Sequence, residues 1–435
     1  MKSTKSVVAR RKAGRRGRRA IAAGIAALVV GTAVTMAASV SAAPSQVTVN
    51  FVTQAIAQAS WSKSVAEFEQ ANPTIKINVR YLPGDYGSLL QTQINSGNIP
   101  DVFYTAPGNG AGQSVLPFVY RKGLVMNLKN EPWVKSIPAV VKPLVSTSKG
   151  VYAWPGDINI VALWYNKPGL QQLGLKPPTT LSQLLTLCGK VSAAGKVPIA
   201  LPVIPAVQAG AVLFANAAAQ GAITPEWLKA RKKKQATFAA SPQWRKAAEA
   251  VVKMKNAKCF SPGVAASTLQ QAFGQLASGQ ALMVAGASQV LNGVFPLIKD
   301  PSAVSFNGVP FPSDKAGQGG VILAPNDGLS VWLHTKVKAA ALTFVRYMAG
   351  EKAAQRFAAS NGNADWAGFV KNRLPSHMTG LLPAVKKHQT VLNPTGIWPN
   401  PRIRETTSAD TVGLLTGQKT PAVLLADADR AYDQG

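Results

Sequence analysis

The sequence is poor in the residues that carry metal and thiol chemistry. Its 435 residues include two cysteines and three histidines, and only 18 acidic residues. Two cysteines cannot make a structural zinc site alone, and the histidines show no ligand spacing with them, so we expect no metal and no cofactor. The patterns of phosphate-binding loops, zinc proteases and G-x-S-x-G hydrolases are absent as well. The sequence therefore predicts a protein that is not an enzyme.

Acidic residues are too few to balance the 47 lysines and arginines, and the formal net charge is +29. The first 43 residues hold nine basic residues and no acidic one, which leaves about +20 spread over the rest of the chain. The one dense block, Arg231–Lys234, is typical of a solvated helix face. Nucleic-acid binding would require basic clusters interleaved with aromatic residues, and none is found. A basic cell-envelope protein that binds polyanions is an open alternative.

The N-terminus has the composition of an export signal. A basic head is followed by an apolar run over residues 20–40 and by small residues at 41–43. This order predicts a signal peptide over residues 1–43 that is cleaved near Ala42 or Ala43. The run is also long enough to span a membrane, so an uncleaved anchor is the alternative. No later segment looks transmembrane, and we expect an exported body in the periplasm or at the extracellular cell surface.

The two cysteines, Cys188 and Cys259, have a specific meaning in an exported protein. Oxidising surroundings favour a disulfide between them. The enclosed loop of 71 residues would contribute roughly 4 kcal/mol to stability if the bond is unstrained. Two separately buried free thiols are the alternative.

Hydrophobic periodicity alternates between strands and helices from residue 47 onward. The stretches QVTVNFVTQ, TIKINVRYLP and PDVFYTA have strand patterns, and helical spacing separates them. This β-α-β-α-β order predicts a mostly parallel sheet with helices on its faces. The middle of the chain is richer in helix, with Thr180 and Ser241 as predicted N-caps. The length exceeds what one core usually organises, so we expect two lobes.

Four stretches in the same order resemble the maltose-binding-protein-like family of carbohydrate-binding proteins that serve ABC importers. They are VAEFEQANPTIKINV, SGNIPDVFYT, YAWPGDINIVALWYNKPGLQQLGLKPPTTLSQLL and FGQLASGQALMVAGAS. The resemblance implies an α/β, periplasmic-binding-protein-like bilobal fold, in which a multi-strand hinge joins two α/β lobes that close on a ligand. It further implies a monomer that binds a sugar or oligosaccharide in the inter-lobe cleft and delivers it to a membrane permease.

The resemblance also implies where the chain passes between lobes. After the signal peptide, residues 44–153 are expected to form the N-terminal lobe and residues 154–305 the C-terminal lobe. Residues 306–358 are expected to return to the N-terminal lobe, and residues 359–435 to complete the C-terminal one.

Residues 151–166, VYAWPGDINIVALWYN, are expected to run between the lobes and to contact the ligand. Indole rings stack on the C–H faces of a sugar, while carboxylates and amides hydrogen-bond its hydroxyls. Trp154, Asp157 and Asn159 are therefore predicted ligand contacts. The alternative is that Trp154 packs in the hinge and Asp157 caps a turn. In either case, Trp164 and Tyr165 are expected to face the core.

Further ligand contacts are predicted from position. Family members often have a tryptophan where this chain has Ser288, so Trp366 or Trp398 is expected to supply the missing ring, with core packing as the alternative. An anionic sugar such as a sugar phosphate would need a cation, and Arg402 and Arg404 are the nearest suggestion. The predicted ligand-binding residues are Gln54, Thr105, Trp154, Asp157, Asn159, Ser288, Asn326, Trp366 and Trp398.

Overall fold

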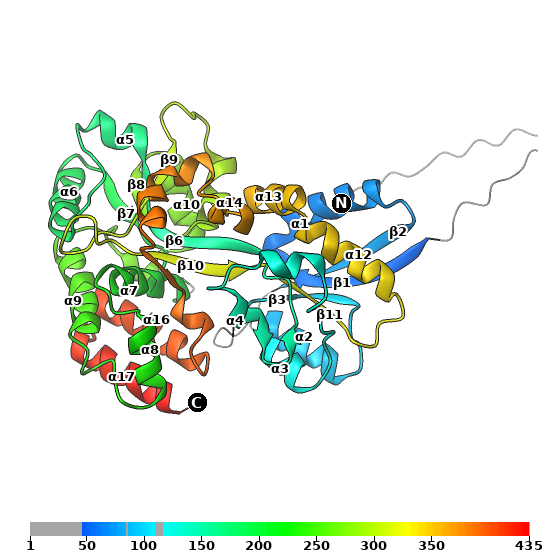
Figure 1. The fold of residues 1–435 in the computed structure, drawn as a ribbon. Helices are drawn as coiled ribbons and strands as arrows, with labels where there is room; N and C mark the ends of the chain where they lie inside the picture. The colour runs from blue at the N-terminus through cyan, green and yellow to red at the C-terminus, as the bar shows by residue number, and fades with distance from the viewer. Residues whose placement is uncertain (1–45, 84–85, 109–115, 205, 435) are drawn as a thin grey trace, which may run out of the picture. The chain divides into compact units, whose positions relative to one another are not determined.

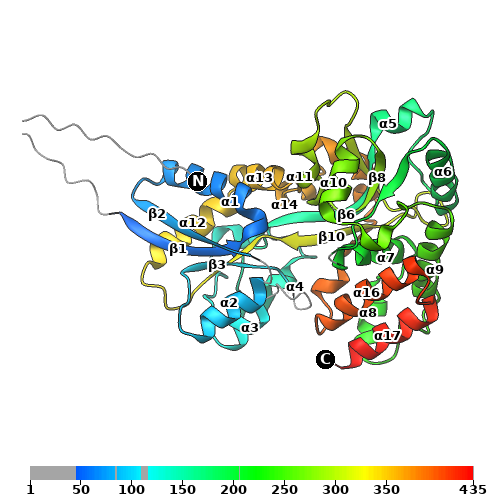
Figure 2. The ribbon, with the colours of Figure 1, turned by 180° about the vertical axis from the view of Figure 1, so that it is seen from behind.

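Two β-sheets organise the part of the chain that the computed structural model describes, residues 46–83, 86–108, 116–204 and 206–434 (Figures 1 and 2). The predicted signal peptide, with its cleavage site or anchor, lies outside the described residues. Among the described residues, no helix is both long and apolar enough to cross a membrane.

The smaller sheet has four strands in the order β11-β3-β1-β2. Strands β1, β2 and β3 run parallel to one another, and β11 pairs antiparallel with β3. Helices follow β1 and β2, so the predicted β-α-β-α-β order is confirmed. The elements are β1 (Val47–Gln54), α1 (Gln58–Ala71), β2 (Ile75–Leu82), α2 (Tyr86–Asn95), β3 (Val102–Thr105) and β11 (Gly328–Val331).

The larger sheet has the order β12-β10-β6-β8-β7, with β9 paired to β6. Its central strand β6 is buried at every position except Asn159, which is half-buried, and this fits the apolar run at residues 160–164. Its strands are β6 (Asp157–Asn166), β7 (Val197–Ala200), β8 (Ala281–Ala287), β9 (Phe306–Val309), β10 (Val321–Asn326) and β12 (Thr390–Leu392). Residues 306–358 were predicted to return to the N-terminal lobe. Strands β9 and β10 of this range pair in the larger sheet, whereas β11 joins the smaller sheet.

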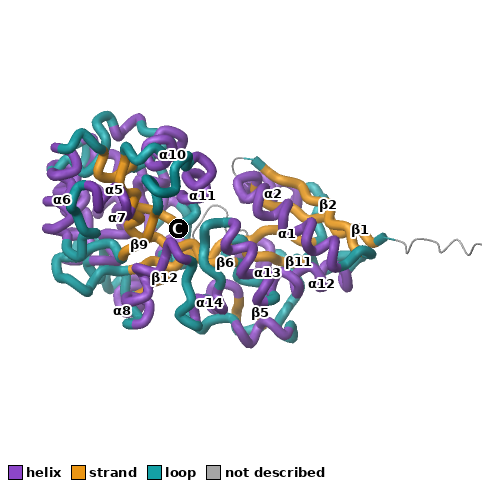
Figure 3. The backbone as a smooth tube through the Cα atoms, turned by 90° about the horizontal axis from the view of Figure 1, so that it is seen from above, coloured by secondary structure: helices purple, strands orange, loops and turns teal. Residues whose placement is uncertain are grey.

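Helices flank both sheets (Figure 3). The predicted N-caps are confirmed, because Thr180 accepts a hydrogen bond from Gln183 N and Ser241 accepts one from Trp244 N. The remaining long helices are α6 (Leu181–Ala193), α7 (Val207–Ala219), α8 (Pro225–Lys232), α9 (Pro242–Asn256), α10 (Leu269–Ala277), α12 (Lys338–Ala349), α13 (Glu351–Ser360), α16 (Arg402–Thr416) and α17 (Pro421–Asp433).

A disulfide joins Cys188 in α6 to Cys259, which follows α9. Both residues are fully buried, and their Cα atoms lie 4.8 Å apart. The predicted disulfide is therefore confirmed, and it fastens the end of α9 to α6 beside the larger sheet.

Three short stretches, residues 154–157, 326–328 and 361–364, pass between the two sheets, and we call them the crossing segments. Trp154 pairs with Leu329, Asp157 with Asn326, and Ile158 with Ala364. The predicted bilobal fold with a multi-strand connection is confirmed by this arrangement.

The crossing segments contain two residues with left-handed backbone, Gly156 at φ 71° and Asp327 at φ 52°. A Cβ atom on Gly156 would lie only 1.7 Å from the carbonyl oxygen of Asn326, so a side chain does not fit there. Glycine at residue 156 therefore lets the first two crossing segments approach each other closely.

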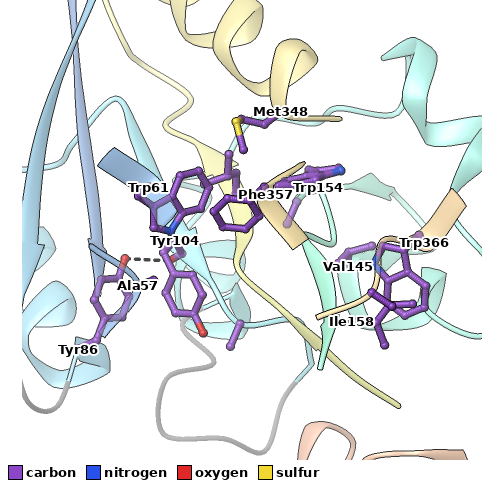
Figure 4. Packing of buried hydrophobic residues seen from close by; sticks show 14 of the residues in the cluster. Ala57, Trp61, Tyr86, Tyr104, Val145, Trp154, Ile158, Met348, Phe357 and Trp366 are labelled. Carbon is purple, nitrogen blue, oxygen red and sulfur yellow. Dashed lines mark hydrogen bonds between the residues drawn. The ribbon is translucent and has the colours of Figure 1, made fainter. Parts of the chain in front are cut away.

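Buried aromatic residues build the core beside the smaller sheet (Figure 4). The ring centre of Trp61 lies 4.9 Å from that of Phe51 and 4.3 Å from that of Phe357, so α1 packs on β1 and α13 packs on α1. Trp164 and Tyr165 are also buried, as predicted for the later part of β6.

Candidate functional site

Two carboxylates meet where the crossing segments lie side by side. Asp157 and Asp327 are both almost fully buried, with exposed fractions of 1% and 0%. The Nδ2 atom of Asn361 lies 3.0 Å from Asp157 Oδ2 and 3.2 Å from Asp327 Oδ2, so one amide donates to both. Asn363 donates to the same Asp157 oxygen at 3.0 Å, and Asn326 donates to Asp327 Oδ2 at 2.7 Å. All three crossing segments thus contribute to one hydrogen-bonded group.

Burial changes the acidity of this carboxylate pair. It raises the pKa of Asp157 to about 7, although the amides of Asn363 and Asn361 act in the opposite direction. Burial, and then the charge of Asp157, raise the pKa of Asp327 well above its ordinary value. Two like charges that share one amide in a desolvated site cannot both ionise easily. The pair therefore holds at least one proton near pH 7.

The hydrogen-bonded group continues toward the end of β8. The hydroxyl of Ser288 lies 2.7 Å from Asn363 Oδ1 and 3.0 Å from Asn159 Oδ1, within donating distance of both. Asn159 Oδ1 also accepts from the backbone N–H of Gln289 at 3.2 Å, and Asn159 Nδ2 lies 3.4 Å from Gln289 Oε1. We call this set the polar cluster; its members are Asp157, Asn159, Ser288, Gln289, Asn326, Asp327, Asn361 and Asn363.

Tyr104, at the end of β3, reaches the polar cluster from the smaller sheet. Its hydroxyl donates to Asn326 Oδ1 at 3.4 Å. Burial, and then the charges of Asp327 and Asp157, raise the pKa of Tyr104, while Arg404 and a hydrogen bond with Gln54 act in the opposite direction. The phenol therefore stays protonated and acts as a donor beside the two acids.

Arg404, in the first turn of α16, approaches the same place from the side of the larger sheet. Burial lowers the pKa of this guanidinium, although the nearby Tyr104 and the charge of Glu405 act in the opposite direction. No described carboxylate forms an ion pair with Arg404. A half-buried guanidinium without an acidic partner can donate to an oxygen-rich ligand.

Exposure divides the polar cluster into two functional parts. Asn159, Gln289 and Asn326 are half-buried, whereas the other members are buried. These three half-buried residues are thus the members of the polar cluster that solvent reaches. The buried acids, amides and hydroxyl fix their positions through hydrogen bonds, which is the arrangement expected of a preorganised binding site.

Two tryptophans predicted to contact ligand lie in another place. Trp154 and Trp366 line a cavity of about 480 Å³ together with Trp133, and no member of the polar cluster lines it. Figure 4 shows Trp154 and Trp366 on separate elements, with Ile158 close to Trp366. We call this cavity the tryptophan pocket.

The remaining predicted residues are engaged within their own lobes. Thr105 is fully buried and shares a hydrogen bond with Ser330 at 2.9 Å between their hydroxyl oxygens. Trp398 is buried against Phe214, with ring centres 5.4 Å apart. Gln54 forms a hydrogen bond with Tyr104 beside the polar cluster. The other predicted residues, Asp157, Asn159, Ser288 and Asn326, are members of the cluster itself.

Sequence reasoning missed several members of the site: Tyr104, Gln289, Asn361, Asn363 and Trp133. The stretch NGNAD at residues 361–365 carried a usable signal, because two amides flank a glycine directly after a helix. Tyr104 and Trp133 read as ordinary core residues, since only the fold brings them to the crossing segments.

The comparison with known families agrees with this architecture. The family described as bacterial extracellular solute-binding protein matches residues 53–355. This chain belongs to that family. The family resemblance predicted from the sequence is therefore confirmed.

Individual relatives are similar to this solute-binding protein over part of its length. The multiple sugar-binding protein of Streptococcus mutans is 28% identical over 143 residues, 33% of each chain. The melibiose/raffinose/stachyose-binding protein MelE of Bacillus subtilis is 23% identical over 128 residues, which are 29% of this chain and 28% of MelE. The matched part thus spans about a third of the length of these curated relatives.

Solved structures match over nearly the whole chain. Apo RafE from Streptococcus pneumoniae superimposes with a TM-score of 0.70 at 19% identity, covering 90% of this chain and 99% of RafE. The GacH receptor of Streptomyces glaucescens gives a TM-score of 0.72 at 18% identity, covering 89% of this chain and 98% of GacH. These likenesses establish the bilobal fold of the solute-binding protein.

Proposed function

We propose that this solute-binding protein is the extracytoplasmic substrate-binding component of an ABC importer. It binds a sugar or oligosaccharide at the accessible amides of the polar cluster and delivers it to permease subunits in the membrane. The protein acts outside the cytoplasm as a monomer, and nucleic acid is not a partner.

One observation carries the proposal: the half-buried amides of Asn159, Gln289 and Asn326 are held in place by buried hydrogen-bonding groups. Sugar hydroxyls both donate and accept, and an amide side chain offers both functions. Because a hydroxyl left unpaired in a closed site is costly, such a ligand requires several fixed polar partners. The guanidinium of Arg404 adds a donor near Tyr104.

The relatives support this class of ligand. The two curated relatives are named as binders of multiple sugars and of melibiose, raffinose and stachyose. RafE has been solved with raffinose, and GacH with acarbose. Five members of the polar cluster, Asp157, Asn326, Asp327, Asn361 and Asn363, lie in the crossing segments. A ligand bound beside them would contact parts of both lobes and favour the closed arrangement.

The buried acids favour binding without catalysis. Glycoside hydrolysis requires two carboxylates on opposite sides of the scissile bond, roughly 5 to 10 Å apart, with a substrate between them. Asp157 and Asp327 instead share one amide of Asn361 and are buried. We infer that they hold the crossing segments together and perform no reaction on a sugar.

An anionic sugar, such as a sugar phosphate, is the second candidate, and the unpaired guanidinium of Arg404 favours it. A charged ligand would gain a charge-assisted hydrogen bond there, which a neutral sugar would not. Binding of such a ligand would weaken with salt, whereas binding of a neutral sugar would not.

Calorimetric titration of the mature chain, meaning residues 44–435 without the predicted signal peptide, tests the proposal. The panel contains melibiose, raffinose, stachyose, maltotriose and glucose 6-phosphate at low and high salt. Saturable binding of a neutral saccharide that is weakened in Asn159→Ala and unchanged in Asn98→Ala supports the proposal. Asn98 is an exposed asparagine of the smaller-sheet lobe and serves as the matched control. Failure of every saccharide, with retention on heparin that salt removes, favours a polyanion-binding envelope protein instead.

A further inference from the structure

Basic residues are concentrated in one stretch of the larger-sheet lobe. Residues 229–258 cover the end of α8, the loop after it and all of α9. They contain ten lysines and arginines and one acidic residue, Glu249. The chain after the predicted signal peptide has a net charge of about +20, so this short stretch holds nearly half of the excess.

Arg231 differs from the solvated helix face that the sequence predicts for residues 231–234. It is 1% exposed, and its Cζ atom lies 4.0 Å from the ring centre of Tyr432. It forms ion pairs with Asp429 at 3.3 Å and with Asp433 at 3.0 Å. These partners belong to α17, so Arg231 fastens the end of α8 to that helix and fixes the place of the lysines that follow it.

The other basic residues of this stretch lie at the surface. We call them the basic face; its members are Lys229, Lys232, Lys233, Lys234, Arg245, Lys246, Lys253, Lys255 and Lys258. Lys255 is half-buried and the rest are exposed. Among the described residues, the only ion-pair partner of the basic face is Asp314, which lies 3.7 Å from Lys246. So many unpaired cations in one region attract an anionic partner.

The aromatic rings of this region pack α8 against α9. The ring centres of Trp227 and Trp244 lie 5.5 Å apart, and Phe238 lies 5.0 Å from each of them. Phe238 and Trp244 are buried, and Trp227 is half-buried between them. Binding of single-stranded nucleic acid requires exposed rings on which bases stack, so these rings argue against such a partner.

The basic face is too long for one small anion. Helix α9 has 15 residues and spans about 22 Å at a rise of 1.5 Å per residue. Arg245 lies near its start, and Lys258 lies just beyond its end. Charge attraction at the surface extends only about 8–10 Å at moderate salt. A partner that contacts both ends at once is therefore an extended anionic surface.

Lysine predominates on the basic face, and Arg245 is its single arginine. A lysine ammonium is a mobile point charge that requires no fixed geometry, unlike the planar fork of a guanidinium. Lys234 and Lys258 even occupy left-handed positions after α8 and α9, with φ 59° and 56°, where Gly221 and Gly279 follow α7 and α10. Lysine is thus kept at two positions whose backbone favours glycine. Mobile ammonium groups suit a surface with many equivalent charges.

We propose that the basic face docks on the surface of a membrane that contains anionic phospholipids. The choice of a membrane rests on the proposed function, because an importer component works beside a bilayer. Lysine side chains attract anionic headgroups, and this attraction weakens with salt. None of the large apolar residues that are exposed lies in residues 229–258, so the protein rests on the headgroups without inserting.

Vesicle flotation of the mature chain tests the proposal, and the predicted signal peptide is left out because it would bind lipid itself. The vesicles contain phosphatidylcholine alone or with about one third phosphatidylglycerol. We expect binding to the anionic vesicles at about 0.1 M salt, loss of binding at about 0.5 M salt, and no binding to the neutral vesicles.

Two variants that remove the same charge separate the basic face from the net charge. The first changes three consecutive lysines of the basic face: Lys232→Gln, Lys233→Gln and Lys234→Gln. The control changes three exposed lysines elsewhere, which form no ion pair with a described residue: Lys129→Gln, Lys142→Gln and Lys149→Gln. Binding to anionic vesicles should fall at least about tenfold in the first variant and stay within about twofold in the control.

A third variant tests whether both ends of the basic face contact the membrane. Lys253→Gln combined with Lys258→Gln removes two cations at the far end of α9 and should weaken vesicle binding at least about threefold. Unchanged binding would overturn the proposal of an extended contact. Circular dichroism checks that each variant is folded.

Three other results would overturn the membrane contact. They are absence of binding to anionic vesicles at low salt, equal loss of binding in the two triple variants, and binding of soluble polyphosphate without binding of vesicles. Vesicle binding is measured without saccharide, and saccharide binding without vesicles. Failure of the membrane contact therefore leaves the import proposal standing, and failure of saccharide binding does not imitate it.

Discussion

The buried pair Asp157 and Asp327 makes a specific prediction about stability and pH. In the unfolded chain an aspartate has a pKa near 3.9, whereas burial raises the pKa of Asp157 to about 7 in the folded protein. Folding then favours the protonated form. Stability from this group is complete below the unfolded pKa and is lost as the pH rises through the folded pKa.

The size of the effect follows from the shift. A rise in the pKa of Asp157 from 3.8 to about 7 corresponds to roughly 4 kcal/mol in the free energy of unfolding. This stability is lost as the pH rises from about 4 to about 7. Asp157→Asn removes the titrating group and keeps an oxygen that accepts from Asn361 and Asn363. Its new amide N–H₂ replaces Asp157 Oδ1, which has no hydrogen-bond partner in the described structure.

Urea denaturation of the mature chain at pH 4.5, 6, 7 and 8 measures this difference. Asp157→Asn should differ from the natural chain by no more than about 1 kcal/mol at pH 4.5 and exceed it by about 2–4 kcal/mol at pH 8. The control Asp314→Asn, at an exposed carboxylate, should change stability by no more than about 0.5 kcal/mol at any pH. A natural chain that gains stability steadily from pH 4.5 to 8, or a variant that is less stable at pH 8, would refute the reasoning.

Three further predictions concern ligand affinity, the backbone and the disulfide. Asn159→Ala should weaken saccharide binding at the polar cluster roughly tenfold or more in calorimetry, because it removes hydrogen bonds to the ligand and to Gln289. Gly156→Ala should lower the free energy of unfolding by at least about 2 kcal/mol in urea, owing to the left-handed backbone and the 1.7 Å approach of a Cβ to Asn326 O; an unchanged midpoint would contradict this. Replacing both cysteines by serine should cost roughly 4 kcal/mol in thermal or urea unfolding, and stability equal to that of the oxidised chain would argue against the loop-closure account.

Local patterns predicted much of the fold. Strict alternation in TIKINVRYLP and helical spacing in the next segment are short-range properties, and both sheets contain strands where such patterns occur. The helix caps at Thr180 and Ser241 depend on residues within three positions, so the sequence predicts them directly. The disulfide followed from export and from the presence of only two cysteines.

The candidate site was predicted only in part because its contacts are long-range. Asp157 and Asn361 are separated by 204 positions, and Ser288 and Asn363 by 75. Nothing near Asn361 in the sequence indicates an aspartate as its partner. The alternation of apolar and polar residues does not show that Gly156 adopts a left-handed conformation. The sequence therefore could not predict on which side of the chain Trp154 lies relative to Asp157.

The tryptophans show the same limit. Trp366 lines a cavity with Trp154, whereas Trp398 is buried beside Phe214. Packing between distant segments decides which neighbours each indole has, and the local sequence does not show it.

The most direct test of the account is a crystal structure of the mature chain with the saccharide that binds most tightly in the titration panel. The account predicts a sugar between the lobes, with hydroxyls within hydrogen-bond distance of Asn159, Gln289 and Asn326. A saccharide bound elsewhere, with these three amides facing only solvent, would contradict it.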